Sequence, residues 1–202
     1  MIAKSLFYPA FAGRPRPSSD ELLLPDTDTG SEGVRLRAVL GATTSEDLLP
    51  NMIRSEVEGR LWMLTPGAFR YFLPAFLTAS LDDYSALRTF VAELVTALTK
   101  PTAGDIVQAL DRVGEIPAEM GLKSDTLELL RRQQLDWYNS GTPSATFESR
   151  VDGLSLAEGA AILRFLRMIN DAHSQEFPFQ EPRVAIDRHW FRYTEENSDS
   201  TD

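Results

Sequence analysis

Apolar residues recur at helical spacing along much of the chain, and the clearest stripe lies in its first half. This stripe follows the i, i+3, i+4, i+7, i+8 pattern and consists of Phe69, Phe72, Leu73, Phe76 and Leu77. Thr65 provides an N-cap and Pro66 a first-turn residue, so the pattern predicts a central core helix that begins at Pro66. Pro74 lies inside the stripe and removes the hydrogen bond to the carbonyl of Arg70, which predicts a bend at this point.

Other segments with the same periodicity predict helices on both sides of this one. Their expected bounds are about 50–63, 83–98, 125–139 and 156–172, and a shorter helix is expected within 102–113. The helix at 156–172 has a clear start signal, because Ser155 and Glu158 form a capping box. Asp82 and Asp83 are interpreted as the acidic start of the helix at 83–98.

The chain loses helical periodicity after residue 175. Residues 176–193 predict an extended arm that packs on the core, because their prolines argue against a helix. The alternation of Val184 and Ile186 is compatible with one short strand. Residues 194–202 predict a disordered acidic tail.

Helical periodicity without a series of strands predicts an all-α fold. We expect a compact single-domain helical bundle of about five to seven helices, with an irregular N-terminal arm and an extended C-terminal arm. The domain is expected to span residues 1–193, with a loop-rich arm at 1–45 and a helical core at 46–175. The leucine triplet Leu22–Leu24 is expected to hold the N-terminal arm on the core.

The charge of the chain narrows the classes of partner. The 202 residues include no cysteine, and 20 Lys and Arg stand against 30 Asp and Glu, which gives a formal net charge of -10. The absence of cysteine excludes a disulfide scaffold and a thiolate metal site. A phosphate backbone selects clustered basic residues, so nucleic acid is not an expected partner. A basic protein is the partner that this charge favours, although the same charge also serves solubility. We recognise no membrane span and no export signal, and expect a cytoplasmic protein without a membrane partner.

Motifs of common catalytic chemistry are missing from the sequence. There is no G-x-S-x-G elbow, no P-loop and no dinucleotide-binding glycine fingerprint. His173 and Glu176 have metal-ligand spacing, but no second pair completes a site, and His173 is interpreted as a solvated residue at a helix end. We therefore expect no metal and no cofactor. The sequence favours a non-enzymatic protein without deciding the question, because 30 acidic residues leave many possible acid-base pairs.

Three groups of residues are candidate binding positions. Arg70 and Tyr71 lie beside the carbonyl that Pro74 frees, where they predict a small polar site. Two further groups could contact a partner protein, namely the acidic pair Asp82 and Asp83 and the aromatic residues Trp190, Phe191 and Tyr193. The aromatic group also fits a C-terminal arm that docks on the bundle.

The central helix carries a resemblance to a known family. The segment Leu64–Leu77 has the sequence LTPGAFRYFLPAFL and resembles a family of functionally uncharacterised bacterial proteins built around an LTPEAFRYYLPAYL-like helix. Residues 10–17, AFAGRPRP, are similar to that family's AF-x-x-x-PRP opening, and residues 154–166 are similar to its LTPEQ-x-x-x-x-x-x-FL helix. Gly67 stands where the family carries Glu. The resemblance implies a bacterial, intracellular, helical protein and no particular activity.

These observations favour a non-enzymatic protein-binding module, such as an immunity or antitoxin-type inhibitor of a basic partner protein. An alternative is a small-molecule-binding protein or small enzyme with a pocket near the bend at Pro74, where Arg70 would bind an anion. A third alternative is a structural subunit of a larger assembly. The sequence leaves open the oligomeric state, and whether the C-terminal arm packs on its own chain or on another.

Overall fold

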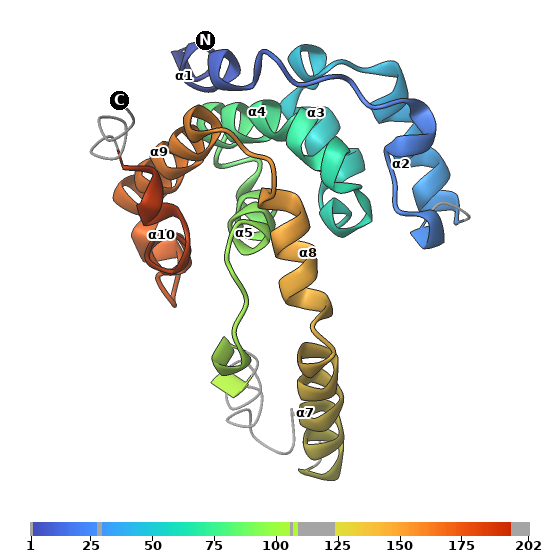
Figure 1. The fold of residues 1–202 in the computed structure, drawn as a ribbon, viewed down its shortest axis with the longest axis vertical. Coiled ribbons are helices and arrows are strands. Elements are labelled where there is room, and N and C mark those ends of the chain that lie inside the picture. The colour runs from blue at the N-terminus through green and yellow to red at the C-terminus, as the bar shows by residue number, and fades with distance from the viewer. Residues whose placement is uncertain (1, 28–29, 106, 109–123, 195–202) are drawn as a thin grey trace. The chain divides into compact units, whose positions relative to one another are not determined.

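The computed structural model describes all residues except 1, 28–29, 106, 109–123 and 195–202 (Figure 1). The described part of the chain is helical and contains no strand, only an isolated antiparallel bridge between Leu23 and Leu64. The predicted all-α class is therefore confirmed. Most of the tail expected at 194–202 and half of the residues of the short helix expected within 102–113 lie outside the described residues.

The chain divides into two compact units. The first unit comprises residues 1–99 and 152–202, and the second comprises residues 100–151. The α-helices of the first unit are α1 (Ile2–Phe11), α2 (Ser31–Ala42), α3 (Pro50–Met52), α4 (Pro66–Asp82), α5 (Arg88–Ala97), α9 (Leu156–His173) and α10 (Glu181–Arg188). Its 3-10 and π-helical turns are η1 (Ser19–Glu21), η2 (Pro25–Thr27), η3 (Ser45–Asp47), η4 (Ile53–Val57), η5 (Leu61–Met63), η6 (Ser174–Glu176) and η7 (Trp190–Tyr193). The single-domain organisation expected over 1–193 remains a prediction.

The second unit contains two described helices, α7 (Ser124–Asn139) and α8 (Thr142–Val151), which pack against each other. Helix α7 agrees with the helix expected at 125–139. Gly141 separates it from α8 with a φ of 80°, a left-handed conformation that glycine adopts without steric cost. An exposed ion pair joins Lys100 Nζ to Glu148 Oε1 at 3.6 Å.

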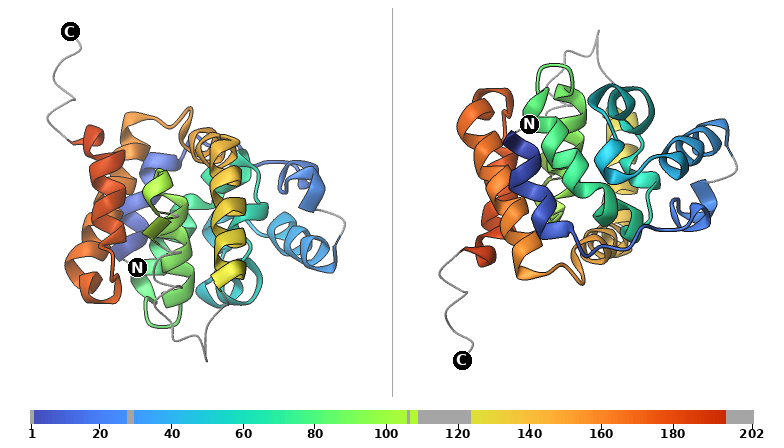
Figure 2. Two further views of the ribbon diagram at one scale, coloured as in Figure 1. Left: turned by 90° about the horizontal axis from the view of Figure 1, so that it is seen from below. Right: turned by 90° about the horizontal axis from the view of Figure 1, so that it is seen from above.

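Helix α4 lies at the centre of the first unit and packs against α1, α5 and α9. Seen from above in Figure 2, α1 lies along both α4 and α9. The core between them is rich in aromatic side chains that are less than 2% exposed: Phe7, Phe69, Phe72, Phe76, Phe90, Phe165 and Trp190. Burial of each of these rings stabilises the fold by about 1.5–3 kcal/mol. The cap predicted for α4 is confirmed, because the Thr65 hydroxyl accepts a hydrogen bond from the N–H of Ala68 at 3.1 Å.

A loop-rich N-terminal arm was expected over 1–45, but α1 and α2 occupy much of it. In α1, Phe7 and Phe11 are four residues apart and are only 0% and 4% exposed, so one face of this helix is anchored in the core. Pro9 lies inside α1, and because proline is disfavoured within helices the sequence did not indicate a helix here. Helix α2 buries only Gly33, Leu36 and Leu40, a stripe too narrow to stand out.

The leucine triplet between these two helices holds the arm on the core as predicted. Leu22 and Leu23 are 1% and 2% exposed. The backbone of this segment pairs with the entry to α4, where the N–H of Thr65 donates to the carbonyl of Leu22 at 3.0 Å. Leu24 is the exposed member of the triplet.

The C-terminal arm was predicted to be extended, and this prediction is wrong, because residues 181–188 form α10. Pro182 occupies the first turn of this helix, where its missing N–H costs nothing. The buried positions in this segment, Pro182, Ala185 and His189, have helical spacing, whereas Val184 and Ile186 are half-buried. The proline that argued against a helix therefore starts one.

The single helix expected at 50–63 is broken into three parts. Helix α3 continues as the π-helix η4, the chain turns at Gly59 with a φ of 78°, and η5 follows. The carboxylate of Glu93 accepts the N–H of Gly59 at 2.7 Å and that of Leu61 at 3.0 Å. A side chain from α5 thus replaces the backbone bonds that a continuous helix would have made.

The helix expected to start at Asp83 begins only at Arg88, because α4 extends to Asp82. Asp83 is the C-cap of α4. The acidic group at the start of α5 is instead Glu58, whose carboxylate accepts the N–H of Phe90 at 3.1 Å. The assignment of Asp82 and Asp83 to the start of this helix is therefore corrected.

Candidate functional site

The first unit contains a cleft between α1, η3 and α4, which we call the α1–α4 cleft. Its volume is about 870 Å³. The lining residues that matter for its chemistry are Lys4, Tyr8, Ser45, Glu46, Asp47 and Tyr71, and Pro74 also borders it. The cleft therefore lies beside the two α4 residues, Tyr71 and Pro74, near which the sequence placed a candidate pocket.

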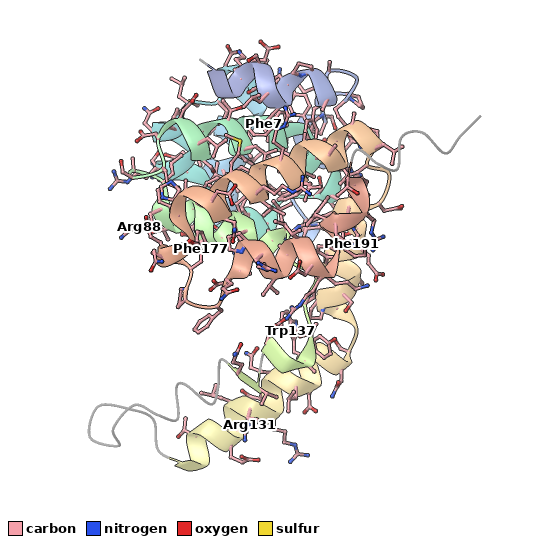
Figure 3. The ribbon with its side chains drawn as sticks, turned by 90° about the vertical axis from the view of Figure 1, so that its left-hand side faces the viewer. Phe7, Arg88, Arg131, Trp137, Phe177 and Phe191 are labelled. Carbon is pink, nitrogen blue, oxygen red and sulfur yellow. The ribbon has the colours of Figure 1, made fainter. Side chains whose placement is uncertain are left out.

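Helix α1 delivers Tyr8 to this cleft because the neighbouring Phe7 is held in the core. Phe7 packs edge-on against Phe165 of α9 at 6.4 Å between ring centroids, on the side of α1 that faces the other helices (Figure 3). The hydroxyl of Tyr8 donates to the backbone carbonyl of Ser45 at 2.6 Å. The bond ties α1 to η3, which are two of the three elements that border the cleft.

Ser45 has an unusual environment for a buried polar residue. It is 6% exposed, and its hydroxyl has no hydrogen-bond partner among the described residues. Its backbone N–H donates to the hydroxyl of Tyr71 at 3.4 Å, and the Tyr71 hydroxyl donates to no acceptor in the described part of the chain. Buried polar groups are normally paired, so two neighbouring hydroxyls with unused capacity in one cleft indicate a place for a ligand group.

The charged side chains on this side of the cleft are Lys4, which contacts Glu46 and Tyr8, and Asp47, which bonds to Thr44. Lys4 Nζ lies 3.1 Å from Glu46 Oε2 and 5.0 Å from the centroid of the Tyr8 ring. Asp47 accepts a hydrogen bond from the hydroxyl of Thr44 at 2.5 Å. The wall formed by α1 and η3 therefore carries a cation, two carboxylates and an aromatic ring.

Burial raises the pKa of the Tyr8 hydroxyl. The bond to Ser45 acts in the opposite direction, and the nearby carboxylates of Glu46 and Asp47 add to the increase. The phenol is therefore a neutral hydrogen-bond donor over the physiological pH range.

Arg14 also borders the cleft and connects it to the start of α9. Its guanidinium binds both carboxylate oxygens of Glu158, at 2.5 and 2.6 Å, and donates to the carbonyl of Gly153 at 2.6 Å. Glu158 is 3% exposed and completes the predicted capping box, since it accepts the N–H of Ser155 at 2.7 Å. Burial alone would raise the pKa of Glu158, but the bonds from Arg14 and Ser155 outweigh it and hold the pKa below its usual value.

Arg70 completes this cluster from α4. Its Nη1 donates to the carbonyl of Asp152 at 3.0 Å. Burial lowers the pKa of Arg70, and the positive charge of Arg14 lowers it further. The cluster brings together three separate segments of the chain, through Arg14, Arg70 and Glu158.

The candidate pair Arg70 and Tyr71 is thus divided by the structure. Tyr71 lines the α1–α4 cleft, whereas Arg70 is not among its lining residues and instead holds the segment before α9. The idea of Arg70 as the anion ligand of a pocket at Pro74 has no support in this geometry.

The other candidates also take different positions. Asp82 is exposed at the end of α4, and Asp83 is half-buried. Trp190 is fully buried, and its indole N–H donates to the carbonyl of Leu98 at 2.6 Å, so it is a core residue rather than a surface anchor. Phe191 is 54% exposed and points away from the core at the C-terminal end (Figure 3).

Tyr193 packs on α9. Its ring lies so close to Gly159 that a Cβ at that position would overlap it. Its neighbours on the other side are the rings of His189 and Trp190. Of the three aromatic candidates, Phe191 is exposed, Tyr193 is half-buried and Trp190 is buried.

Sequence reasoning missed Lys4, Tyr8, Ser45, Glu46 and Asp47. The only local signal was the spacing of Thr44 and Asp47, which is that of a capping box. In the structure their side chains bond to each other, and Thr44 makes no side-chain cap bond to the backbone. Nothing in the sequence pairs that turn with Tyr8, because the contact spans 37 positions of the chain.

His173 and Glu176, the pair with metal-ligand spacing, do contact each other. His173 Nδ1 lies 3.2 Å from Glu176 Oε1, and the imidazole stacks on the Tyr84 ring at 3.4 Å between centroids. Arg88 binds the same carboxylate at 2.5 Å. Within the described residues, no group of three or more His, Cys, Asp or Glu side chains could hold a metal ion.

Comparisons of the chain with protein-family models, with curated proteins and with solved structures find no significant match. None of the described helices is both long and apolar enough to cross a membrane. Function must therefore be argued from the geometry of the α1–α4 cleft and from the charge of the chain.

Proposed function

We propose that this protein is a binding protein that holds a polar ligand in the α1–α4 cleft. The observation that carries the proposal is the Ser45 hydroxyl, which is 6% exposed, lines the cleft and has no partner among the described residues. An unpaired buried hydroxyl costs about 1–3 kcal/mol, a cost that a bound ligand would relieve. The adjacent Tyr71 hydroxyl offers a hydrogen-bond donor to the same ligand.

The test compares two serines that share the same defect but differ in location. Ser80 is 0% exposed and also has an unpartnered hydroxyl among the described residues, but it does not line the cleft. We expect both Ser45→Ala and Ser80→Ala to leave the free energy of unfolding unchanged or to raise it by about 1 kcal/mol. Only Ser45→Ala should affect ligand binding.

Binding would be followed by saturation-transfer NMR with a panel of free amino acids, glucose, succinate and simple amines. Compounds that bind the wild type should bind Ser45→Ala about 2- to 10-fold more weakly, as expected for one lost hydrogen bond, and should bind Ser80→Ala unchanged. A panel without any binder, or binders that do not distinguish the two variants, would contradict the proposal.

A second candidate function is recognition of a basic protein partner, which the net charge of -10 favours. Asp82 and Phe191 are the exposed members of the candidate set that could take part. Affinity capture of the tagged protein from its native cells at low and at elevated salt tests this function. We expect one stoichiometric basic protein that salt releases, and that Asp82→Lys binds less well at low salt.

A further inference from the structure

Lys4 marks a position in the α1–α4 cleft where a cation is favoured. Its ammonium group lies 3.1 Å from the Glu46 carboxylate and 5.0 Å from the Tyr8 ring centroid, so it has both an ion pair and a cation–π contact. The Lys4 and Glu46 side chains are 45% and 68% exposed. An exposed ion pair of this kind is weak, so another cation can take the place of Lys4 at little cost.

The other charged residues that line the cleft also favour the binding of a cation there. The positive charge of Arg14 is compensated by the bidentate bond to Glu158. Asp47 accepts a hydrogen bond only from the Thr44 hydroxyl, as far as the described residues show. Once Lys4 leaves, the two carboxylates of Glu46 and Asp47 therefore face the cleft without a compensating cation.

The hydroxyls in the cleft define a second requirement. An ammonium group has three donors and no acceptor, so it cannot use the proton of the Tyr71 hydroxyl. A carbonyl oxygen elsewhere on the same ligand would accept that proton, and the Ser45 hydroxyl can serve either group. A lysine residue within a peptide carries both features.

We propose that the α1–α4 cleft binds a lysine side chain of a peptide segment, whose ammonium group replaces Lys4 between the Tyr8 ring and the Glu46 carboxylate. This inference rests on the proposed function of the cleft and specifies its ligand. It agrees with the acidic charge of the chain and gives a basic partner a definite point of attachment. It also gives Lys4 the role of an internal competitor.

The test uses N-acetyl-lysine-N-methylamide as the probe, titrated into the full-length protein and followed by the NMR shifts of residues 44–47. The matched neutral probe is N-acetyl-norleucine-N-methylamide, and butylammonium represents a free amine. The lysine probe should bind at least fivefold more tightly than the norleucine probe, because only it makes the ion pair and the cation–π contact. Equal binding of the two amides overturns the proposal, and equal binding of butylammonium overturns its peptide part.

Two variants of the cleft should change the affinity for the lysine probe in opposite directions. Glu46→Gln should weaken binding about fivefold, whereas Lys4→Met should tighten it about three- to tenfold by removing the competitor. The controls are Glu148→Gln and Lys100→Met, the same substitutions in an exposed ion pair of the second unit, which should change the affinity less than twofold.

The sign of the Lys4→Met effect is decisive. If this variant binds the lysine probe more weakly or with unchanged affinity, Lys4 is not a competitor and the proposal fails. If the lysine probe does not bind while other compounds bind in a Ser45-dependent way, this inference fails but the proposed function stands. If no compound binds at all, the proposed function fails first.

Discussion

The Arg14 and Glu158 pair allows the sharpest prediction about stability. Glu158 is 3% exposed, and both of its carboxylate oxygens are bound by Arg14, whose side chain is 22% exposed. Removal of one partner from a buried ion pair costs about 3–5 kcal/mol, because the other charge stays buried without compensation. Water can reach this site from the Arg14 side and Glu158 keeps its bond from Ser155, so we expect Arg14→Ala to cost about 3 kcal/mol.

The assay is urea unfolding at neutral pH, with thermal unfolding as a second measurement. For a chain of this size a loss of about 3 kcal/mol lowers the Tm by about 6–12 °C. The control is Arg183→Ala, because Arg183 and Asp187 form an ion pair at 3.6 Å with both side chains more than 60% exposed. This control should change the free energy of unfolding by less than about 0.5 kcal/mol.

The pKa of Glu158 also determines how the stability difference between wild type and Arg14→Ala depends on pH. The folded-state pKa of Glu158 is lowered from 4.5, so its contribution is present above that value and is lost as the pH falls through the folded-state pKa. The gap between wild type and Arg14→Ala should therefore be complete at neutral pH and shrink in acid. The double variant Arg14→Ala with Glu158→Gln should lose less than the two single variants together. A cost below about 1 kcal/mol for Arg14→Ala, or strict additivity in the double variant, would refute the reasoning.

Three further predictions concern contacts around the cleft and the C-terminal segment. Tyr8→Phe should lower the free energy of unfolding by about 1 kcal/mol at neutral pH. Because burial raises the folded-state pKa of Tyr8, its contribution is lost as the pH rises above about 10, so the difference from wild type should shrink in thermal scans at high pH. Gly159→Ala should lower the free energy of unfolding by about 1–3 kcal/mol in urea, because the added Cβ overlaps the Tyr193 ring. In a Tyr193→Ala background the same substitution should be stabilising, because only helix propensity then matters. A change of the same sign in both backgrounds would contradict the packing of Tyr193 on Gly159. Trp190→Phe should lower the free energy of unfolding by about 2 kcal/mol, because it leaves the Leu98 carbonyl unpaired. It should also remove the most blue-shifted tryptophan emission, because Trp190 is buried, and an unchanged spectrum would contradict this burial.

Local signals account for what the sequence predicted correctly. The N-cap at Thr65 and the capping box of Ser155 and Glu158 each depend on residues three positions apart, and both hydrogen-bonding patterns are present. The aromatic stripe of α4 is likewise a property of one helix and needs no knowledge of its neighbours. These signals were sufficient for the all-α class and for the central helix.

The sequence did not predict α1, α10 or the break at Gly59, because each of them depends on contacts with residues far away in the chain. Helix α1 contains Pro9, and α10 has Pro182 in its first turn, so their formation depends on the burial of a few side chains such as Phe7 and Ala185. The break at Gly59 is stabilised by Glu93, which lies 34 positions further along the chain. Tertiary contacts of this kind override local propensity and leave no periodic trace in the sequence.

The candidate site could be predicted only in part for the same reason. Tyr71 was singled out because it follows Arg70 and precedes Pro74, and it does line the cleft. The opposite wall depends on α1, and without that helix the contact between Tyr8 and Ser45 could not be foreseen. A site formed by two segments needs both of them to be predicted.

Ser45 and Ser80 share a buried hydroxyl but differ in their position relative to the α1–α4 cleft. Both hydroxyls are buried and lack a partner among the described residues, so an unpaired hydroxyl by itself does not identify a site. Ser80 lies on the central helix and does not line the α1–α4 cleft, so a ligand there could not relieve its defect. Ser45 borders the cleft beside the Tyr71 hydroxyl, whose proton meets no acceptor in the described part of the chain, and a ligand can pair with both groups. The combination of an unpaired buried group and an accessible cleft is what indicates binding, because proteins tolerate such local costs mainly where function requires them.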